Sequence, residues 1–159
     1  MRFIKFIFIY TAIITSSVIL SACKTIPTIS FDDPDKIINI SISANSGSNP
    51  DLAGRPSPTV IKIYQLSSDG KFKQTDFFTL YDDDSTLSSD VLEHRELLLA
   101  SQSSNSLLMT LDPKTQYIGI TAAFQQSNNA KYKLLIPIGK RSTQSAAVKL
   151  LVNQLVLSE

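Results

Sequence analysis

Residues 38–43, Ile38-Asn39-Ile40-Ser41-Ile42-Ser43, decide the fold, because apolar and polar side chains alternate along them. Successive side chains of a β-strand point to opposite faces, so this alternation is typical of a strand with one buried face. A second strand is predicted over residues 60–66, where Tyr64 lies in a run rich in β-branched residues. The fold is therefore built outward from two strands that lie close together in the sequence.

Further strand-like runs follow, separated by turn residues. We expect residues 95–100 and 106–111 to form a pair joined by a polar loop, and we expect single strands over residues 117–124, 131–138 and 146–157. Seven or so short strands at close spacing predict an all-β fold, a two-sheet antiparallel β-sandwich over residues 36–159, rather than alternating βαβ units.

A helical insertion is predicted at about residues 75–92. Thr75 or Asp76 is placed to cap a short helix, and a second turn is expected to run through Leu87, Val91 and Leu92. The helix would carry the apolar residues Phe77, Phe78, Leu80 and Tyr81. We interpret these side chains as core that covers one end of the sandwich, with a ligand-binding cluster as the alternative.

The N-terminus has the layout of a bacterial lipoprotein signal. Two basic residues precede a largely apolar stretch over residues 6–20, which is shorter than the roughly 20 apolar residues of a membrane span. It ends in Leu20-Ser21-Ala22-Cys23, which resembles the lipobox that is cut before an acylated cysteine. We expect residues 1–22 to be removed as a signal peptide, Cys23 to carry the lipid, and residues 23–35 to form a tether. An uncleaved membrane anchor is the alternative.

The lipid also predicts the location of the protein. Lys24 stands where aspartate commonly retains lipoproteins in the inner membrane, so we expect sorting to the outer membrane, with the domain on the periplasmic face. Each buried methylene contributes roughly 0.8 kcal/mol, so attachment through two or three acyl chains is effectively permanent. Cys23 is the only cysteine, so the domain has no intrachain disulfide and no cofactor is expected beyond the covalent lipid.

Charge and residue content argue against several functions. The 15 basic and 14 acidic residues nearly balance and are scattered, which does not favour nucleic acid as a partner. His94 is the only histidine and the chain has no G-x-S-x-G motif, so we assign no catalytic residue and no zinc or copper site. Asp82, Asp83 and Asp84 lack the glycine and distal glutamate of a calcium-binding EF-hand loop, which favours a solvated turn.

The loop over residues 48–58, Ser-Asn-Pro-Asp-Leu-Ala-Gly-Arg-Pro-Ser-Pro, is the most distinctive segment of the predicted domain. Its three prolines lower the entropy that the loop would lose on docking, and loops on a rigid scaffold commonly carry binding. Recognition is one interpretation, and blocked edge-to-edge strand pairing is the other. Arg55 is suited either to a paired hydrogen bond with a carboxylate of a partner or to closing the loop onto Asp51.

The chain resembles the type VI secretion lipoprotein family, known as TssJ, SciN or VasD. The resemblance is carried by Asn49–Asp51, Gly54–Pro58 and Tyr64–Leu66 in this order and spacing. Further similarity lies in Asp76–Phe78 with Leu80, in Tyr117–Gly119 and in Ala122–Phe124. Together with the lipobox, the resemblance spans nearly the whole chain.

The resemblance implies a transthyretin-like β-sandwich with a small helical addition, and a structural rather than an enzymatic role. It implies that the periplasmic C-terminal domain of TssM is the partner, within a TssJ-TssL-TssM membrane complex, and that the protein tethers TssM to the outer membrane. In that family the loop between the first two strands is implicated in binding TssM. Carried over residue by residue, this points to Asn49, Pro50, Asp51, Gly54, Arg55, Pro56 and Ser57.

Departures from the family limit what carries over. Gln125 and Tyr132-Lys133 stand where the family often has Arg and a Trp-Arg pair, and Ser101–Ser104 replace a common Pro-Gly turn. We therefore assign no partner contacts to residues 125–133.

Two other functions follow from the residues. A lipoprotein that binds a ligand or glycan on a sandwich face predicts exposed aromatic side chains drawn from Tyr64, Tyr117 and Tyr132. A hydrolase predicts that His94 lies in a cleft beside a serine or a carboxylate.

Overall fold

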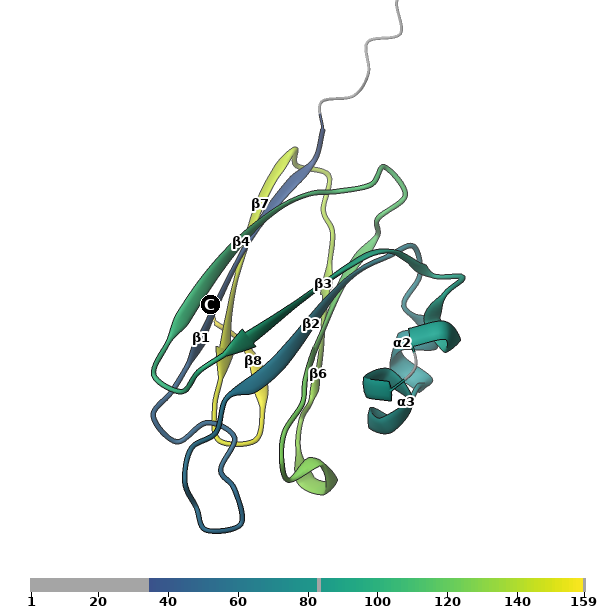
Figure 1. Cartoon of the computed structure of the whole chain (residues 1–159). Helices are drawn as coiled ribbons and strands as arrows, with labels where there is room; N and C mark the ends of the chain where they lie inside the picture. The colour runs from purple at the N-terminus through teal and green to yellow at the C-terminus, as the bar shows by residue number, and fades with distance from the viewer. Residues whose placement is uncertain (1–34, 83, 159) are drawn as a thin grey trace, which may run out of the picture. The chain divides into compact units, whose positions relative to one another are not determined.

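The alternation at Ile38, Ile40 and Ile42 places all three side chains on the buried face of strand β1 (Ile37–Ala44), where none is more than 1% exposed. The computed structural model describes residues 35–82 and 84–158. Within them, two four-stranded sheets lie face to face, with strand orders β4-β1-β7-β8 and β3-β2-β5-β6 (Figure 1). The elements in chain order are β1 (Ile37–Ala44), β2 (Thr59–Leu66), α2 (Gly70–Gln74), α3 (Phe77–Asp82), η2 (Asp84–Leu87), β3 (Val91–Leu99), β4 (Ser104–Thr110), β5 (Tyr117–Ala122), η3 (Ser127–Asn129), β6 (Lys133–Pro137), β7 (Thr143–Leu150) and β8 (Leu155–Ser158).

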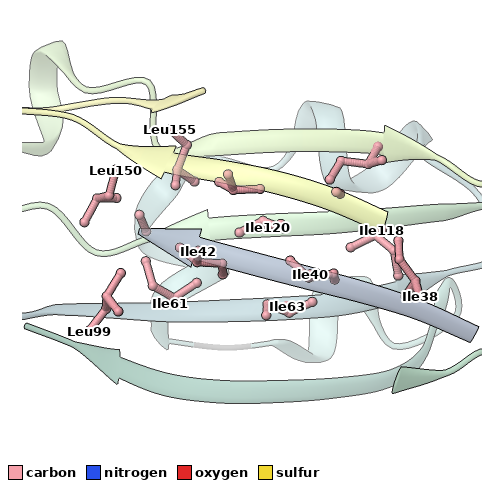
Figure 2. Close-up of a cluster of buried hydrophobic side chains, with 14 of the residues drawn as sticks. Ile38, Ile40, Ile42, Ile61, Ile63, Leu99, Ile118, Ile120, Leu150 and Leu155 are labelled. Atoms are coloured by element: carbon pink, nitrogen blue, oxygen red, sulfur yellow. The ribbon is translucent and has the colours of Figure 1, made fainter. Parts of the chain in front are cut away.

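The main core lies between the two sheets. Figure 2 shows the isoleucines of β1 packed near Ile61 and Ile63 of β2 and near Ile118 and Ile120 of β5. Burying an aliphatic side chain of this size contributes about 1.5–3 kcal/mol, so these facing isoleucines make β1, β2 and β5 the centre of the fold. The predicted sandwich is confirmed.

One pair of strands departs from the antiparallel prediction. β1 and β7 are parallel, with Ile37 opposite Thr143 and Ala44 opposite Leu150, while the other five pairs between the described strands are antiparallel. The chain returns from β6 to the same end at which β1 begins, where the Ile37 amide donates to the Ser142 carbonyl. β7 therefore starts beside the start of β1 and runs in the same direction.

Two strand predictions were wrong in their pairing or extent. Residues 95–100 and 106–111 do not pair, because β3 hydrogen-bonds to β2 in one sheet and β4 to β1 in the other. Both strands bury alternate side chains in the same core, so their pattern does not reveal which sheet each joins. The run 146–157 is interrupted by a turn, closed by a hydrogen bond from the Leu151 amide to the Gln154 carbonyl.

The helical insertion lies earlier than predicted and covers a different surface. Helical turns occupy α2, α3 and η2 between residues 70 and 87, whereas Val91 and Leu92 belong to β3. Asp76 begins α3 as predicted, since its carboxylate accepts bonds from the Thr79 amide at 3.1 Å and hydroxyl at 2.8 Å. The insertion packs on the outer face of one sheet rather than on an end of the sandwich, in a second buried cluster of Tyr64, Leu66, Phe72, Leu80 and Leu87.

The two short helices are attached to the sheet partly through lysines near their C-terminal ends. Lys133 of β6 donates to the carbonyls of Phe72, Lys73 and Thr75 at 2.8–3.0 Å. Lys62 of β2 donates to the Tyr81 carbonyl at 3.0 Å. The last carbonyls of a helix have no hydrogen-bond donor within the helix and carry partial negative charge. A lysine ammonium group at this end donates hydrogen bonds to the carbonyls and is attracted by their charge.

Candidate functional site

The predicted recognition loop is a folded structure in its own right. An antiparallel bridge joins Pro50 and Pro56, and the Asp51 amide donates to the Arg55 carbonyl at 2.9 Å. Gly54, with a φ of 77°, supplies the left-handed turn that residues with a Cβ rarely adopt. The loop is therefore a short, closed hairpin that projects from one end of the sandwich (Figure 1).

Asp51 and Arg55 hold the tip of this hairpin closed. One oxygen of the Asp51 carboxylate accepts the amides of Ala53 and Arg55 at 2.8 and 2.9 Å, and the other accepts Arg55 Nε and Nη2, both at 2.8 Å. The Arg55 backbone amide and guanidinium hold the pKa of the Asp51 carboxyl below its usual value. Of the two roles suggested by the sequence for Arg55, this structure contains the contact that closes the loop.

Asn49 anchors the base of the hairpin. It is 1% exposed, and its φ of 51° lies in the left-handed region, which asparagine tolerates better than most residues. Its side-chain amide donates to the Pro58 carbonyl at 2.9 Å and to the Ala123 carbonyl at 3.5 Å, and its side-chain oxygen accepts the Gln125 amide at 2.7 Å. Asn49 thus joins the β1–β2 loop to the β5–β6 connection.

The seven residues predicted to bind a partner fall into two groups. Asn49 is buried, and Pro50, Asp51 and Ser57 are half-buried at the base and sides of the hairpin. Gly54, Arg55 and Pro56 are exposed, with 80% of the Arg55 side chain accessible. The structure brings all seven into one hairpin and separates those that shape it from those that present its surface.

Leu52 is the exposed residue that sequence reasoning missed. It lies at the tip of the hairpin and is 99% exposed. A single leucine gives no periodic signal in a loop, but its place between Asp51 and the left-handed Gly54 would have identified it as the tip. Among the described residues, Leu52 is the most exposed of the large hydrophobic side chains.

The residues invoked for the other two functions have different surroundings. Tyr64 is completely buried in the second cluster, and Tyr117 and Tyr132 pack against it half-buried, so these three rings do not form the exposed ligand-binding face. His94 is exposed on the edge strand β3, with its ring 6.2 Å from that of Tyr64, so it is not enclosed in a cleft.

Some predicted sites lie outside the described residues. These are Cys23 with the signal peptide, most of the tether, and the side chains of Asp82, Asp83 and Asp84. Among residues 35–82 and 84–158, no helix has the length and apolar composition that a membrane crossing needs. The described side chains include no group of three histidine, cysteine or carboxylate residues that could hold a metal ion.

Comparison with known proteins finds a family whose model matches most of the chain. The family model described as type VI secretion lipoprotein, with VasD, EvfM and TssJ among its names, matches residues 36–153. No match is found among curated proteins.

Several solved structures share the fold. The lipoprotein TssJ1 from Pseudomonas aeruginosa is 28% identical, with a TM-score of 0.74 over 79% of this chain and 96% of that one. Lip from Serratia marcescens, a membrane-bound component of the type VI secretion system, is 20% identical, with a TM-score of 0.74 over 79% and 97%. A structure described as the TssM C-terminal domain from EAEC matches at 21% identity, with a TM-score of 0.67 over 78% and 98%.

Proposed function

This chain belongs to the type VI secretion lipoprotein family, and from that premise we propose that it tethers the periplasmic C-terminal domain of TssM to the outer membrane through the β1–β2 loop. Its lipid, on Cys23, holds it in the periplasmic leaflet of the outer membrane. TssM, rooted in the inner membrane and associated with TssL, completes the connection across the periplasm. The role is mechanical and needs no catalysis.

The observation that carries this proposal is the preformed hairpin. Asp51, Arg55, Gly54 and Asn49 hold the loop in one conformation before any partner arrives. A loop that is already ordered loses little conformational entropy on binding, so more of its contact energy appears as affinity. Leu52 and the exposed side of Arg55 are the groups that it offers.

The position of the hairpin on the sandwich also supports a tether. β1 begins at Ile37, next to the predicted tether, and its eight residues rise about 3.3 Å each, so the hairpin lies about 25 Å from the point where the chain enters the domain. The point where the chain enters the domain and the hairpin therefore lie at opposite ends of β1. The match to the structure described as the TssM C-terminal domain supports the choice of partner.

The test of the partner site is calorimetry with the full-length chain in detergent and the periplasmic C-terminal domain of TssM. Replacing residues 51–55 with glycine and serine should abolish binding, while the same replacement in the exposed turn 139–142 should leave it unchanged. Both variants should keep the wild-type melting temperature within a few degrees. Failure of the unaltered chain to bind TssM, or equal loss in both variants, would refute the proposed site.

The anchor has its own test. Cys23→Ser removes the acceptor of the lipid and with it the cut before an acylated cysteine, so the variant should leave the outer-membrane fraction and keep residues 1–22. Mass spectrometry of the wild-type chain should find acyl chains on a protein that begins at Cys23. A Cys23→Ser variant that still sediments with the outer membrane would contradict lipid anchoring.

A further inference from the structure

The β1–β2 hairpin is too small to form a complete interface. A stable protein interface buries about 800 Å² and about 20–30 residues on each side. The loop spans residues 48–58, and its first two residues, Ser48 and Asn49, are buried. If the proposed function holds, the partner must therefore contact a neighbouring surface as well.

An exposed aromatic surface lies on α3. We call Phe77, Phe78 and Tyr81 the aromatic ledge. The Phe77 ring is stacked on the Tyr81 ring, with 5.9 Å between the ring centroids. It also makes edge-on contacts with the rings of Phe78 and Tyr132, at centroid distances of 5.4 and 5.1 Å. Phe78 is nevertheless 63% exposed and Tyr81 46% exposed, so the expectation that these aromatics are core holds only in part.

The ledge forms one wall of an open hollow of about 450 Å³. The opposite wall comes from the β5–β6 connection, including Phe124, Gln125 and Ser127. None of the described side chains that line the hollow is charged. The three aromatic rings on one wall suit contact with an apolar or aromatic side chain, and Gln125 and Ser127 supply polar groups on the other wall.

The hollow and the hairpin are parts of one rigid surface. Asn49, at the base of the hairpin, bonds the Gln125 amide at 2.7 Å and reaches the Ala123 carbonyl at 3.5 Å, and both residues line the hollow. The β1–β2 loop and η3 lie at the same end of the sandwich in Figure 1. The hollow therefore lies within reach of a partner domain that is seated on the hairpin.

We propose that the aromatic ledge and its hollow are the second half of the TssM-binding surface and receive an apolar side chain of TssM, an inference that rests on the proposed function. The hairpin sets the position of the partner, and the ledge supplies the buried apolar area that the hairpin lacks. Aromatic residues surrounded by a polar rim are the usual centres of binding energy in such interfaces.

The test measures TssM binding to the full-length chain in detergent by calorimetry. Phe78→Ser removes the most exposed ring of the ledge and should weaken binding by about tenfold or more. Leu98→Ser is the matched control, because Leu98 is 68% exposed on β3, and it should leave affinity unchanged. Thermal melting should show both variants folded, since neither side chain lies in the core.

The outcomes separate this inference from the proposed function. If the replacement of residues 51–55 abolishes binding but Phe78→Ser binds like wild type, the hairpin is the site and the ledge is not part of it. If Phe78→Ser instead changes only self-association in sedimentation velocity, the ledge binds a second copy of this chain and the inference is overturned. If the unaltered chain does not bind TssM, the proposed function and the inference fail together.

Discussion

A methyl group at position 119 would have no room. A Cβ built on Gly119 would lie 2.8 Å from a ring carbon of Phe72 and 2.9 Å from a methyl carbon of Leu66, both fully buried. Because Gly119 of β5 has no side chain, α2 can place the Phe72 ring against the sheet. This is a physical reason for glycine in the Tyr117-Ile118-Gly119 segment.

Gly119→Ala should therefore destabilise the protein by about 1–3 kcal/mol, the usual cost of overpacking a core. Urea unfolding monitored by circular dichroism measures the difference. Gly70→Ala is the matched control, because a Cβ there meets nothing within 4 Å, and it should cost nothing. Equal stability of the two variants would mean that the helix shifts away from the sheet at no cost.

Asp51 makes the hairpin sensitive to acid. Because the Arg55 amide and guanidinium lower the pKa of the folded Asp51 carboxyl, the native loop favours the ionised form. Its contribution to stability is complete above about pH 4, the range of a free aspartate, and is lost as pH falls through the lowered pKa. Carbon-detected NMR titration should find a pKa for Asp51 below that of a free aspartate, and Arg55→Ala should raise it. An unchanged pKa in Arg55→Ala would remove the guanidinium as a cause.

At the scale of elements, the helical insertion depends on the sheet for its order. α2 has five residues and α3 has six, too few to be stable as isolated helices. The amine of Lys133, on β6, donates hydrogen bonds to three carbonyls at the C-terminal end of α2. The lysine amine makes all three contacts as a compact point donor.

Lys133→Met should lower the free energy of unfolding by about 1–2 kcal/mol, because it removes charge-assisted hydrogen bonds while keeping most of the packing volume. Hydrogen exchange should accelerate in α2 and leave β1 and β7 unchanged. Lys149→Met, on the exposed face of β7, is the control and should have little effect. Uniform acceleration across both sheets would show that Lys133 supports the whole fold rather than the insertion.

At the scale of the molecule, one buried glutamine ties the two sheets together. Gln65 of β2 is fully buried, and its amide donates to Glu93 of β3 at 2.8 Å and to the Thr110 carbonyl of β4, in the opposite sheet, at 2.9 Å. Its oxygen accepts the Asp112 amide at 2.9 Å and the Thr115 hydroxyl at 2.8 Å. Every hydrogen-bonding position of this side chain that points into the interior has a partner.

Gln65→Met should cost about 2–3 kcal/mol, because it leaves buried groups of both sheets without partners. Gln144→Met is the control, since Gln144 bonds the exposed turn at Gly139 and water can replace it. Chemical denaturation of the two variants gives the comparison. If Gln65→Met lowered the free energy of unfolding no more than Gln144→Met does, the two sheets would be held together by apolar packing alone.

Local patterns in the chain were sufficient for the parts of the fold that depend on neighbours in sequence. The alternation at Ile38, Ile40 and Ile42 identified a buried strand face, Asp76 identified a helix start, and the prolines and Gly54 identified a turn. Each of these features follows from backbone geometry over a few residues. The family resemblance was carried by short motifs and pointed to the correct fold and family.

By itself, the sequence determined the sandwich class and the turn within residues 48–58, while the recognition role of that loop and the lipid signal remain predictions. Only the tertiary structure decided that β3 and β4 join different sheets, that β1 and β7 are parallel, that Arg55 closes onto Asp51, and that Asn49 links the hairpin to the hollow beside α3. A two-residue period shows which side chains face the core, but both sheets face the same core, so the period does not identify the neighbouring strand. Those choices depend on contacts between residues far apart in the chain, such as Asn49 and Gln125, which exist only once the chain has folded.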